Sequence, residues 1–205
     1  MTAGTAPATS DRSDFRHILI SGTRVGAAIG AAVIVYLLVS RLVPPGIAQT
    51  LLQTAVVLAA AVAASLLPAQ WTTARSTQGI AGAAAVGLWG TIVFMAIDII
   101  ALRPLKAYPW TWDAVGGGST WWYLPIWWML GTFVAWMGGL LTAGRAARGG
   151  PTSLLVLATP VLVGALVVTA AAQLARLGVY LPVAAGAAFT ATLTVLAVVA
   201  IARKA

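Results

Sequence analysis

The chain has no cysteine, one histidine and only four acidic residues. Without cysteine it can form no disulfide, no thiolate metal site and no thiol nucleophile. The single histidine, His17, cannot build a bis-histidine haem site or a metal site within this chain. Acid–base and nucleophilic catalysis need a titratable partner within hydrogen-bond reach, and the predicted spans offer only Asp98. The sequence therefore predicts a protein that is not an enzyme and carries no cofactor of its own.

Charged residues of both signs are also scarce. Only 8% of the 205 residues are charged and 60% are hydrophobic, which is too little charge to cover the surface of a soluble domain. A lipid bilayer must therefore supply much of the solvent. Irregular backbone is not stable against lipid, and the sequence shows no alternating strand pattern of about ten residues, so helices are expected. These observations predict an all-α, polytopic integral membrane protein.

Six apolar segments are long enough to cross a bilayer, because a span needs roughly 20 apolar residues. Together they predict a six-helix transmembrane domain over residues 21–205, preceded by a polar, flexible segment over residues 1–20. That polar segment lacks the basic region of a secretory signal, so the first helix should be retained. The predicted spans cover residues 25–43, 49–67, 80–102, 121–142, 154–173 and 182–201.

Prolines punctuate the predicted spans in different ways. Pro68 is expected to end the second span, and Pro182 falls in the first turn of the sixth span, where a missing N–H does no harm. Pro160 lies inside the fifth span and should kink it and free a carbonyl, unless the hydroxyl of Thr159 compensates. Prolines of this kind are common in membrane helices, which favours an ordinary kink over a functional hinge.

Lysine and arginine are distributed unequally between the two sides of a six-span protein. Four lie on the side of the loop at residues 103–120, namely Arg41, Arg103, Lys106 and Arg176, and the other eight lie on the side of both termini. The positive-inside rule therefore predicts cytoplasmic termini in a cytoplasmic (inner) membrane, with the 103–120 loop outside. The net charge of +8 is attributed to attraction toward anionic lipid headgroups. No soluble basic module is present, so no nucleic-acid partner is expected.

Small residues recur at helical spacing in the first span. Gly22, Gly26 and Gly30 lie four residues apart and would form one face that a second helix can approach closely. Packing inside the bundle is favoured over a dimer or partner interface, because such spacings arise easily in a chain rich in glycine and alanine.

Seven of the nine tryptophans lie between Trp110 and Trp136. On an ideal helix Trp121 and Trp128 nearly superpose and Trp136 continues the same side, so these rings extend deeper than an interfacial girdle requires. Such a stripe could contact another helix, a lipid, or a flat hydrophobic pigment or quinone. An aromatic girdle that anchors the helices is the favoured interpretation, and an outer pocket for a cationic ligand is the alternative. That pocket would have an aromatic wall of Tyr108, Trp110 and Trp112, and Asp98 and Asp113 would supply its negative charge. Trp122 belongs with these residues to the wider candidate surface for a ligand or partner.

Asp98 is the only acidic residue inside a predicted span. A carboxylate in hydrocarbon is costly and should face the bundle or a water-filled cavity. The span ends soon afterwards, which places Asp98 near the outer interface, within reach of Arg41, Arg103, Lys106 or Arg176. A structural ion pair is favoured over proton or cation coupling and over a ligand contact.

Two functions follow from these features. The leading hypothesis is a non-catalytic accessory or structural subunit of a larger membrane complex, which packs against lipid and other subunits through small-residue and tryptophan-rich helix faces. The alternative is a small-solute transporter, or the substrate-binding membrane subunit of one, that uses Asp98 and the outer aromatic cluster.

Overall fold

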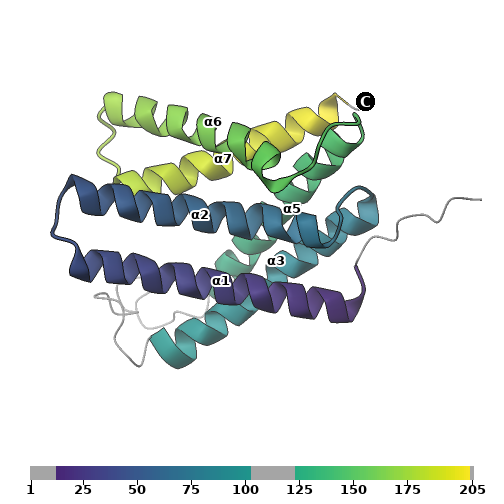
Figure 1. The fold of residues 1–205 in the computed structure, drawn as a ribbon, viewed down its shortest axis with the longest axis horizontal. Helices are drawn as coiled ribbons and strands as arrows, with labels where there is room; N and C mark the ends of the chain where they lie inside the picture. The colour runs from purple at the N-terminus through teal and green to yellow at the C-terminus, as the bar shows by residue number, and fades with distance from the viewer. Residues whose placement is uncertain (1–12, 103–122, 204–205) are drawn as a thin grey trace, which may run out of the picture.

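The computed structural model describes residues 13–102 and 123–203. Within these ranges the chain is helical and contains no strand, which confirms the all-α prediction (Figure 1). The elements are α1 (Phe15–Leu42), α2 (Ile47–Trp71), α3 (Thr77–Ile97), a π-helix η1 (Asp98–Leu102), α5 (Tyr123–Ala146), α6 (Leu154–Leu174) and α7 (Leu181–Ala202).

Six helical segments in the described ranges are long and apolar enough to cross a membrane, as predicted, with α3 and η1 forming one of them. An even number of spans brings the beginning of α1 and the end of α7 to the same end of the bundle, and Figure 1 shows both there. This end is called the terminal end below, and the opposite one the far end. The protein is therefore a multi-pass membrane protein with its lipid-facing surface made by the outsides of these helices.

Three of the differences between the observed helices and the predicted spans lie in α1, in α2 and at the end of the third span. The first helix begins at Phe15 rather than near Val25, because the Asp14 carboxylate caps it by accepting a hydrogen bond from the His17 backbone N–H at 3.0 Å. Residues 15–20 of the segment predicted to be flexible are therefore helical. The second helix continues past Pro68 to Trp71, because a proline near a helix end removes a single backbone hydrogen bond. The last five residues of the third span form the π-helix η1.

Two further prolines lie within the spanning helices. Pro182 lies in the first turn of α7, as predicted. Pro160 lies within α6, which runs without a break from Leu154 to Leu174. The hydroxyl of Thr159 donates to the Leu155 carbonyl at 2.7 Å, so it does not compensate the carbonyl of Val156, four residues before the proline.

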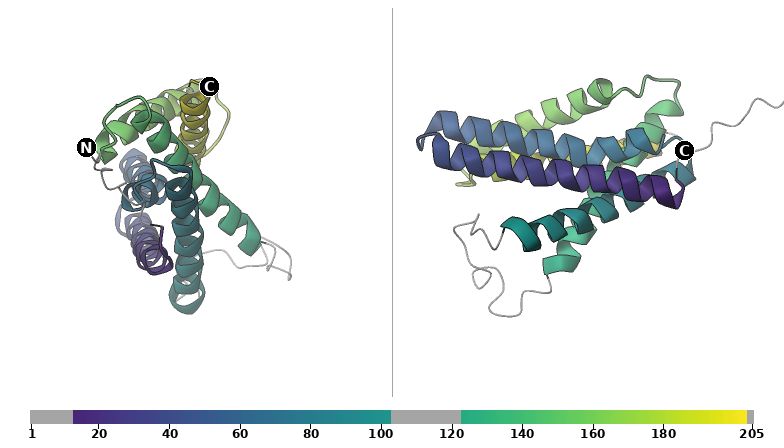
Figure 2. Two further views of the ribbon diagram at one scale, coloured as in Figure 1. Left: turned by 90° about the vertical axis from the view of Figure 1, so that its right-hand side faces the viewer. Right: turned by 60° about the horizontal axis from the view of Figure 1, so that its bottom comes forward.

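The α2 helix packs against α1, α3, α5, α6 and α7. The α3 helix lies between α1 and α5, and α6 packs mainly on α7. Figure 2 shows that the far-end halves of α3 and α5 turn away from α2, α6 and α7. This divergence leaves one half of α5 with few neighbours in the described protein.

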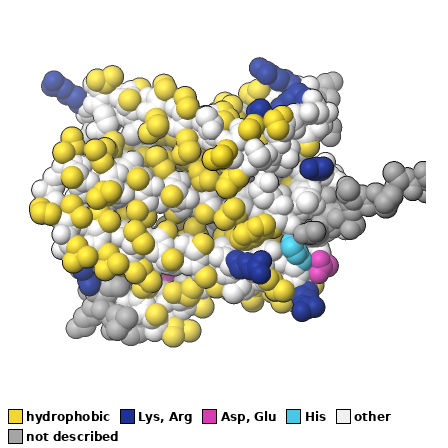
Figure 3. Space-filling view, in the orientation of Figure 1, with side chains coloured by type: hydrophobic (Ala, Val, Ile, Leu, Met, Phe, Trp, Pro, Cys, Tyr) yellow, Lys and Arg dark blue, Asp and Glu magenta, His cyan; other side chains and the backbone are white. Residues whose placement is uncertain are grey.

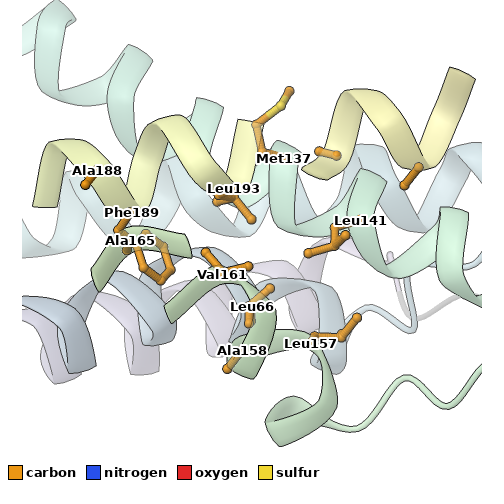
Figure 4. Packing of buried hydrophobic residues seen from close by; sticks show 12 residues of the cluster. Leu66, Met137, Leu141, Leu157, Ala158, Val161, Ala165, Ala188, Phe189 and Leu193 are labelled. Atoms are coloured by element: carbon orange, nitrogen blue, oxygen red, sulfur yellow. The ribbon is translucent and has the colours of Figure 1, made fainter. Parts of the chain in front are cut away.

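The main hydrophobic core is shared by α2, α5, α6 and α7 (Figure 4). Its largest fully buried side chains are Leu66, Leu157, Val161, Phe189 and Leu193. Hydrophobic side chains also cover much of the surface seen in Figure 3. An apolar outer surface of this extent is what a bilayer solvates.

Candidate functional site

The three glycines predicted as a packing face lie against α3. An ideal Cβ on Gly22 would lie 2.7 Å from Cδ1 of Trp89, and one on Gly26 would lie 2.5 Å from the Gly90 carbonyl oxygen. On Gly30 the same atom would lie 3.4 Å from Ile97, which is ordinary contact. The α1–α3 contact is thus closest at Gly26 and looser at Gly30. It is an intramolecular contact between neighbouring helices.

Glycines also bring α5 close to its neighbours. Gly87 of α3 lies against Gly131 and Ala135 of α5, and Gly138 of α5 lies against Ser65 of α2. Close backbone approach of this kind gives van der Waals contact where lipid supplies no hydrophobic drive for helix association. The middle of α5 is therefore closely packed against α2 and α3, while its far-end half is not.

Asp98 is buried, with 7% of its surface exposed, and it begins the π-helix η1. Its depth follows from the preceding residue, since Ile97 meets Gly30, which lies close to the midpoint of α1. From Gly30 to the end of α1 the helix rises about 18 Å, whereas η1 ends only about 7 Å beyond Ile97. Asp98 therefore lies near the middle of the bundle, deeper than its position near the end of the span indicated.

The large side chains exposed along the far-end half and middle of α5 include Trp128, Met129 and Trp136. Met129 is 71% exposed and Trp136 is 45% exposed, and their spacing of seven residues places them nearly in line on the helix. Trp136 lies midway along α5, away from the water interfaces where tryptophan is usually enriched. Within the described ranges its indole N–H has no hydrogen-bond acceptor. These three residues are called the α5 surface.

The remaining residues of the predicted aromatic and acidic group lie outside the described residues. They are Arg103, Trp110, Trp112, Asp113, Trp121 and Trp122. The predicted outer pocket for a cationic ligand and the pairing of Asp98 with Arg103 or Lys106 therefore stay predictions.

A polar network at the far end was not anticipated from the sequence. Gln53 of α2 is only 4% exposed, and its Nε2 donates to the Ser40 hydroxyl of α1 at 2.8 Å. Its Oε1 accepts a hydrogen bond from the hydroxyl of Tyr180, which precedes α7. Tyr180 also interacts with Tyr36 of α1. Gln49 donates to the Ser40 carbonyl at 3.0 Å, which completes the far-end network.

The far-end network ties the turn between α6 and α7 to the α1–α2 hairpin. One sequence signal could have revealed it. Tyr36 and Ser40, and likewise Gln49 and Gln53, are four residues apart, so each pair presents polar groups on one face of a membrane helix. Amides and hydroxyls in such positions usually bond across helices.

The chemistry available in the described residues is limited. They contain no group of three or more His, Cys, Asp or Glu side chains that could hold a metal ion. Asp98 can bind a proton or a cation, and the α5 surface can bind an apolar partner that offers a hydrogen-bond acceptor.

The fold defines the class of this protein as a multi-pass helical membrane protein. No protein-family model, curated protein or solved structure matches the chain. Function must therefore be inferred from the residues themselves.

Proposed function

We propose that the protein is an accessory or structural subunit of a larger membrane complex and that it docks on its partner through the α5 surface. The observation that carries the proposal is Trp136. A half-exposed indole midway along a spanning helix places an N–H donor in hydrocarbon, where lipid chains offer no acceptor and an unsatisfied donor is costly. A partner helix with a backbone or side-chain oxygen at that depth would remove the cost.

The shape of the bundle supports the same proposal. Residues 125–130 of α5 are all exposed, and this half of the helix diverges from α2, α6 and α7 (Figure 2). A second helix could therefore lie alongside Trp128, Met129 and Trp136 without disturbing the core.

Site-specific photocrosslinking in native membranes tests this docking. A benzophenone amino acid at Met129 should give one protein adduct of defined mass. The same amino acid at Val167 of α6, which is 64% exposed, is the matched control and should give only lipid adducts. Trp128→Ala and Trp136→Leu should each reduce the Met129 adduct several-fold, whereas Asp98→Asn should change it little. Protein adducts of equal yield at both positions, or no effect of either tryptophan variant, would contradict the proposal.

A transport function is the second candidate, and the depth of Asp98 favours it. Intramembrane carboxylates commonly mark ion or proton pathways, and π-helical turns are frequent at functional sites. Asp98 combines both features near the middle of the bundle.

Proton flux into vesicles that contain the purified protein tests this second function. Wild-type protein should carry a flux above that of empty vesicles under an imposed membrane potential. Asp98→Asn should abolish this flux, and Asp98→Glu should retain part of it. A wild-type flux equal to the background, or one that Asp98→Asn leaves unchanged, would remove proton transport as a function of Asp98.

A further inference from the structure

Three arginines converge at one corner of the terminal end. Arg145 lies in the last turn of α5, Arg148 in the turn that follows, and Arg203 directly after α7. An ideal Cβ on Gly144 would lie 2.7 Å from Cβ of Ala200, so the ends of α5 and α7 touch. Nη1 of Arg148 donates to the Ala200 carbonyl at 3.0 Å, and Arg203 follows Ala200 by three residues. Figure 3 shows Lys and Arg side chains gathered beside the C-terminal end of the chain.

The positive charge of this corner is not balanced by the described protein. Its acidic residues within residues 13–102 and 123–203 are Asp14, which caps α1, and Asp98, which lies near the middle of the bundle. None of the three arginines forms an ion pair with either carboxylate in the described protein. Like charges held within about one helical turn raise the local potential and attract an anion from the surroundings.

Two of the guanidinium groups are held in place by the protein. Nε of Arg145 donates to the Pro151 carbonyl at 3.0 Å, and Arg148 is held by the Ala200 carbonyl. Each bond uses one of the five N–H donors of a guanidinium, so further donors on each group remain available to a ligand. A planar guanidinium fork matches the oxygen geometry of a phosphate, and fixing it in advance lowers the entropic cost of binding.

Two exposed apolar side chains lie close along the chain to the arginines or their partners, Leu155 four residues after Pro151 and Ile201 two residues before Arg203. Leu155 is strongly exposed in the first turn of α6, and Ile201 is exposed in the last turn of α7. A ligand at this corner would therefore meet positive charge on one side and apolar side chains on the other. A phospholipid with an anionic headgroup has both properties.

We propose that Arg145, Arg148 and Arg203 form a binding site for the phosphate headgroup of an anionic phospholipid, with an acyl chain against Leu155 and Ile201. The site lies at the opposite end of the bundle from the diverging half of α5, and it does not depend on the docking function proposed above. The site would also give three of the positive charges of the chain a specific role in binding lipid.

Native mass spectrometry of the full-length protein in mild detergent tests the site. The probes are phosphatidylglycerol and zwitterionic phosphatidylcholine, titrated separately. Wild-type protein should bind phosphatidylglycerol at least tenfold more tightly. The triple variant R145Q/R148Q/R203Q should lose at least tenfold in affinity for phosphatidylglycerol, because each arginine near the headgroups contributes roughly fivefold. Its affinity for phosphatidylcholine should not change.

The matched control is R24Q/R75Q/R176Q, which removes the same charge from three other exposed arginines. Its affinity for phosphatidylglycerol should stay within about twofold of the wild-type value. Equal losses in both triple variants would overturn the site in favour of net charge alone. If the first triple variant does not fold, Arg203→Gln decides, since no hydrogen bond of its side chain holds the described bundle together. The Arg203→Gln variant should lose about fivefold in affinity for phosphatidylglycerol, and an unchanged affinity would overturn the proposal. Displacement of phosphatidylglycerol by millimolar inorganic phosphate would overturn the assignment to a lipid.

Discussion

Glycine at single positions determines how closely α1 and α3 approach each other. Gly22 accommodates the ring of Trp89, whose Nε1 donates to the Thr23 hydroxyl at 3.1 Å on the same side of α1. Gly26 faces a backbone carbonyl, which cannot rotate away as a side chain can. The two residues therefore differ from Gly30, where a methyl group would fit.

We expect Gly26→Ala to destabilise the protein by about 1–3 kcal/mol, because the added methyl group would lie 2.5 Å from the Gly90 oxygen and force the helices apart. Gly30→Ala is the matched control, with its nearest contact at 3.4 Å, and should be close to neutral. Thermal unfolding of both variants in the same detergent provides the comparison. Equal midpoints for the two variants would show that the α1–α3 contact is not limited by backbone approach at Gly26.

Sequence spacing identified the face formed by Gly22, Gly26 and Gly30, but not the helix that it meets. A four-residue period defines a direction around one helix and contains no information on which neighbour lies there. The depth of Asp98 was missed for a related reason. Counting residues to the end of its own span ignores that α1 continues well beyond the end of η1.

At the scale of whole helices, the far-end network restrains the turn between α6 and α7. This turn contains two residues with positive φ, Arg176 at 53° and Gly178 at 66°. Gln173 also closes it locally by donating to the Val179 carbonyl at 3.0 Å. Tyr180 connects this turn to α2 by its hydrogen bond to Gln53, and it also interacts with Tyr36 of α1.

Replacement of Gln53 by methionine should loosen this turn selectively. The variant keeps the volume of the side chain but removes the bonds to Ser40 and Tyr180, at a cost of about 1 kcal/mol. Hydrogen–deuterium exchange should therefore become faster in residues 176–180. Gln70→Met, which removes a bond to the Thr152 carbonyl at the terminal end, is the control and should leave residues 176–180 unchanged. Faster exchange spread over all six spans in Gln53→Met would instead mean a general loss of stability.

Hydrophobicity predicted the number and order of the spans, but not where every helix begins or how it is wound. It reports which residues suit hydrocarbon, whereas α1 starts ten residues before its apolar stretch because Asp14 caps it at the terminal end. No periodicity in the sequence marks the change to a π-helix at Asp98. The far-end network depends on long-range pairs, such as Tyr180 with Gln53, that only the folded bundle brings together.

The whole molecule is asymmetric in charge from one end to the other. Of the described arginines, two lie toward the far end, Arg41 and Arg176, and the others lie toward the terminal end. The latter are Arg16, Arg24, Arg75, Arg145, Arg148 and Arg203. This asymmetry is the basis for expecting the terminal end to face the cytoplasm.

The lack of cysteine makes this orientation directly measurable, because a single introduced thiol is the only one present. Leu177→Cys marks the far end and Ala147→Cys marks the terminal end, and both positions are exposed in turns outside the helices. A membrane-impermeant maleimide should label Leu177→Cys in intact cells and label Ala147→Cys only after the membrane is permeabilised. The reverse pattern would place the six arginines outside. In that case the arginine corner would meet the outer leaflet, and its lipid would have to come from there.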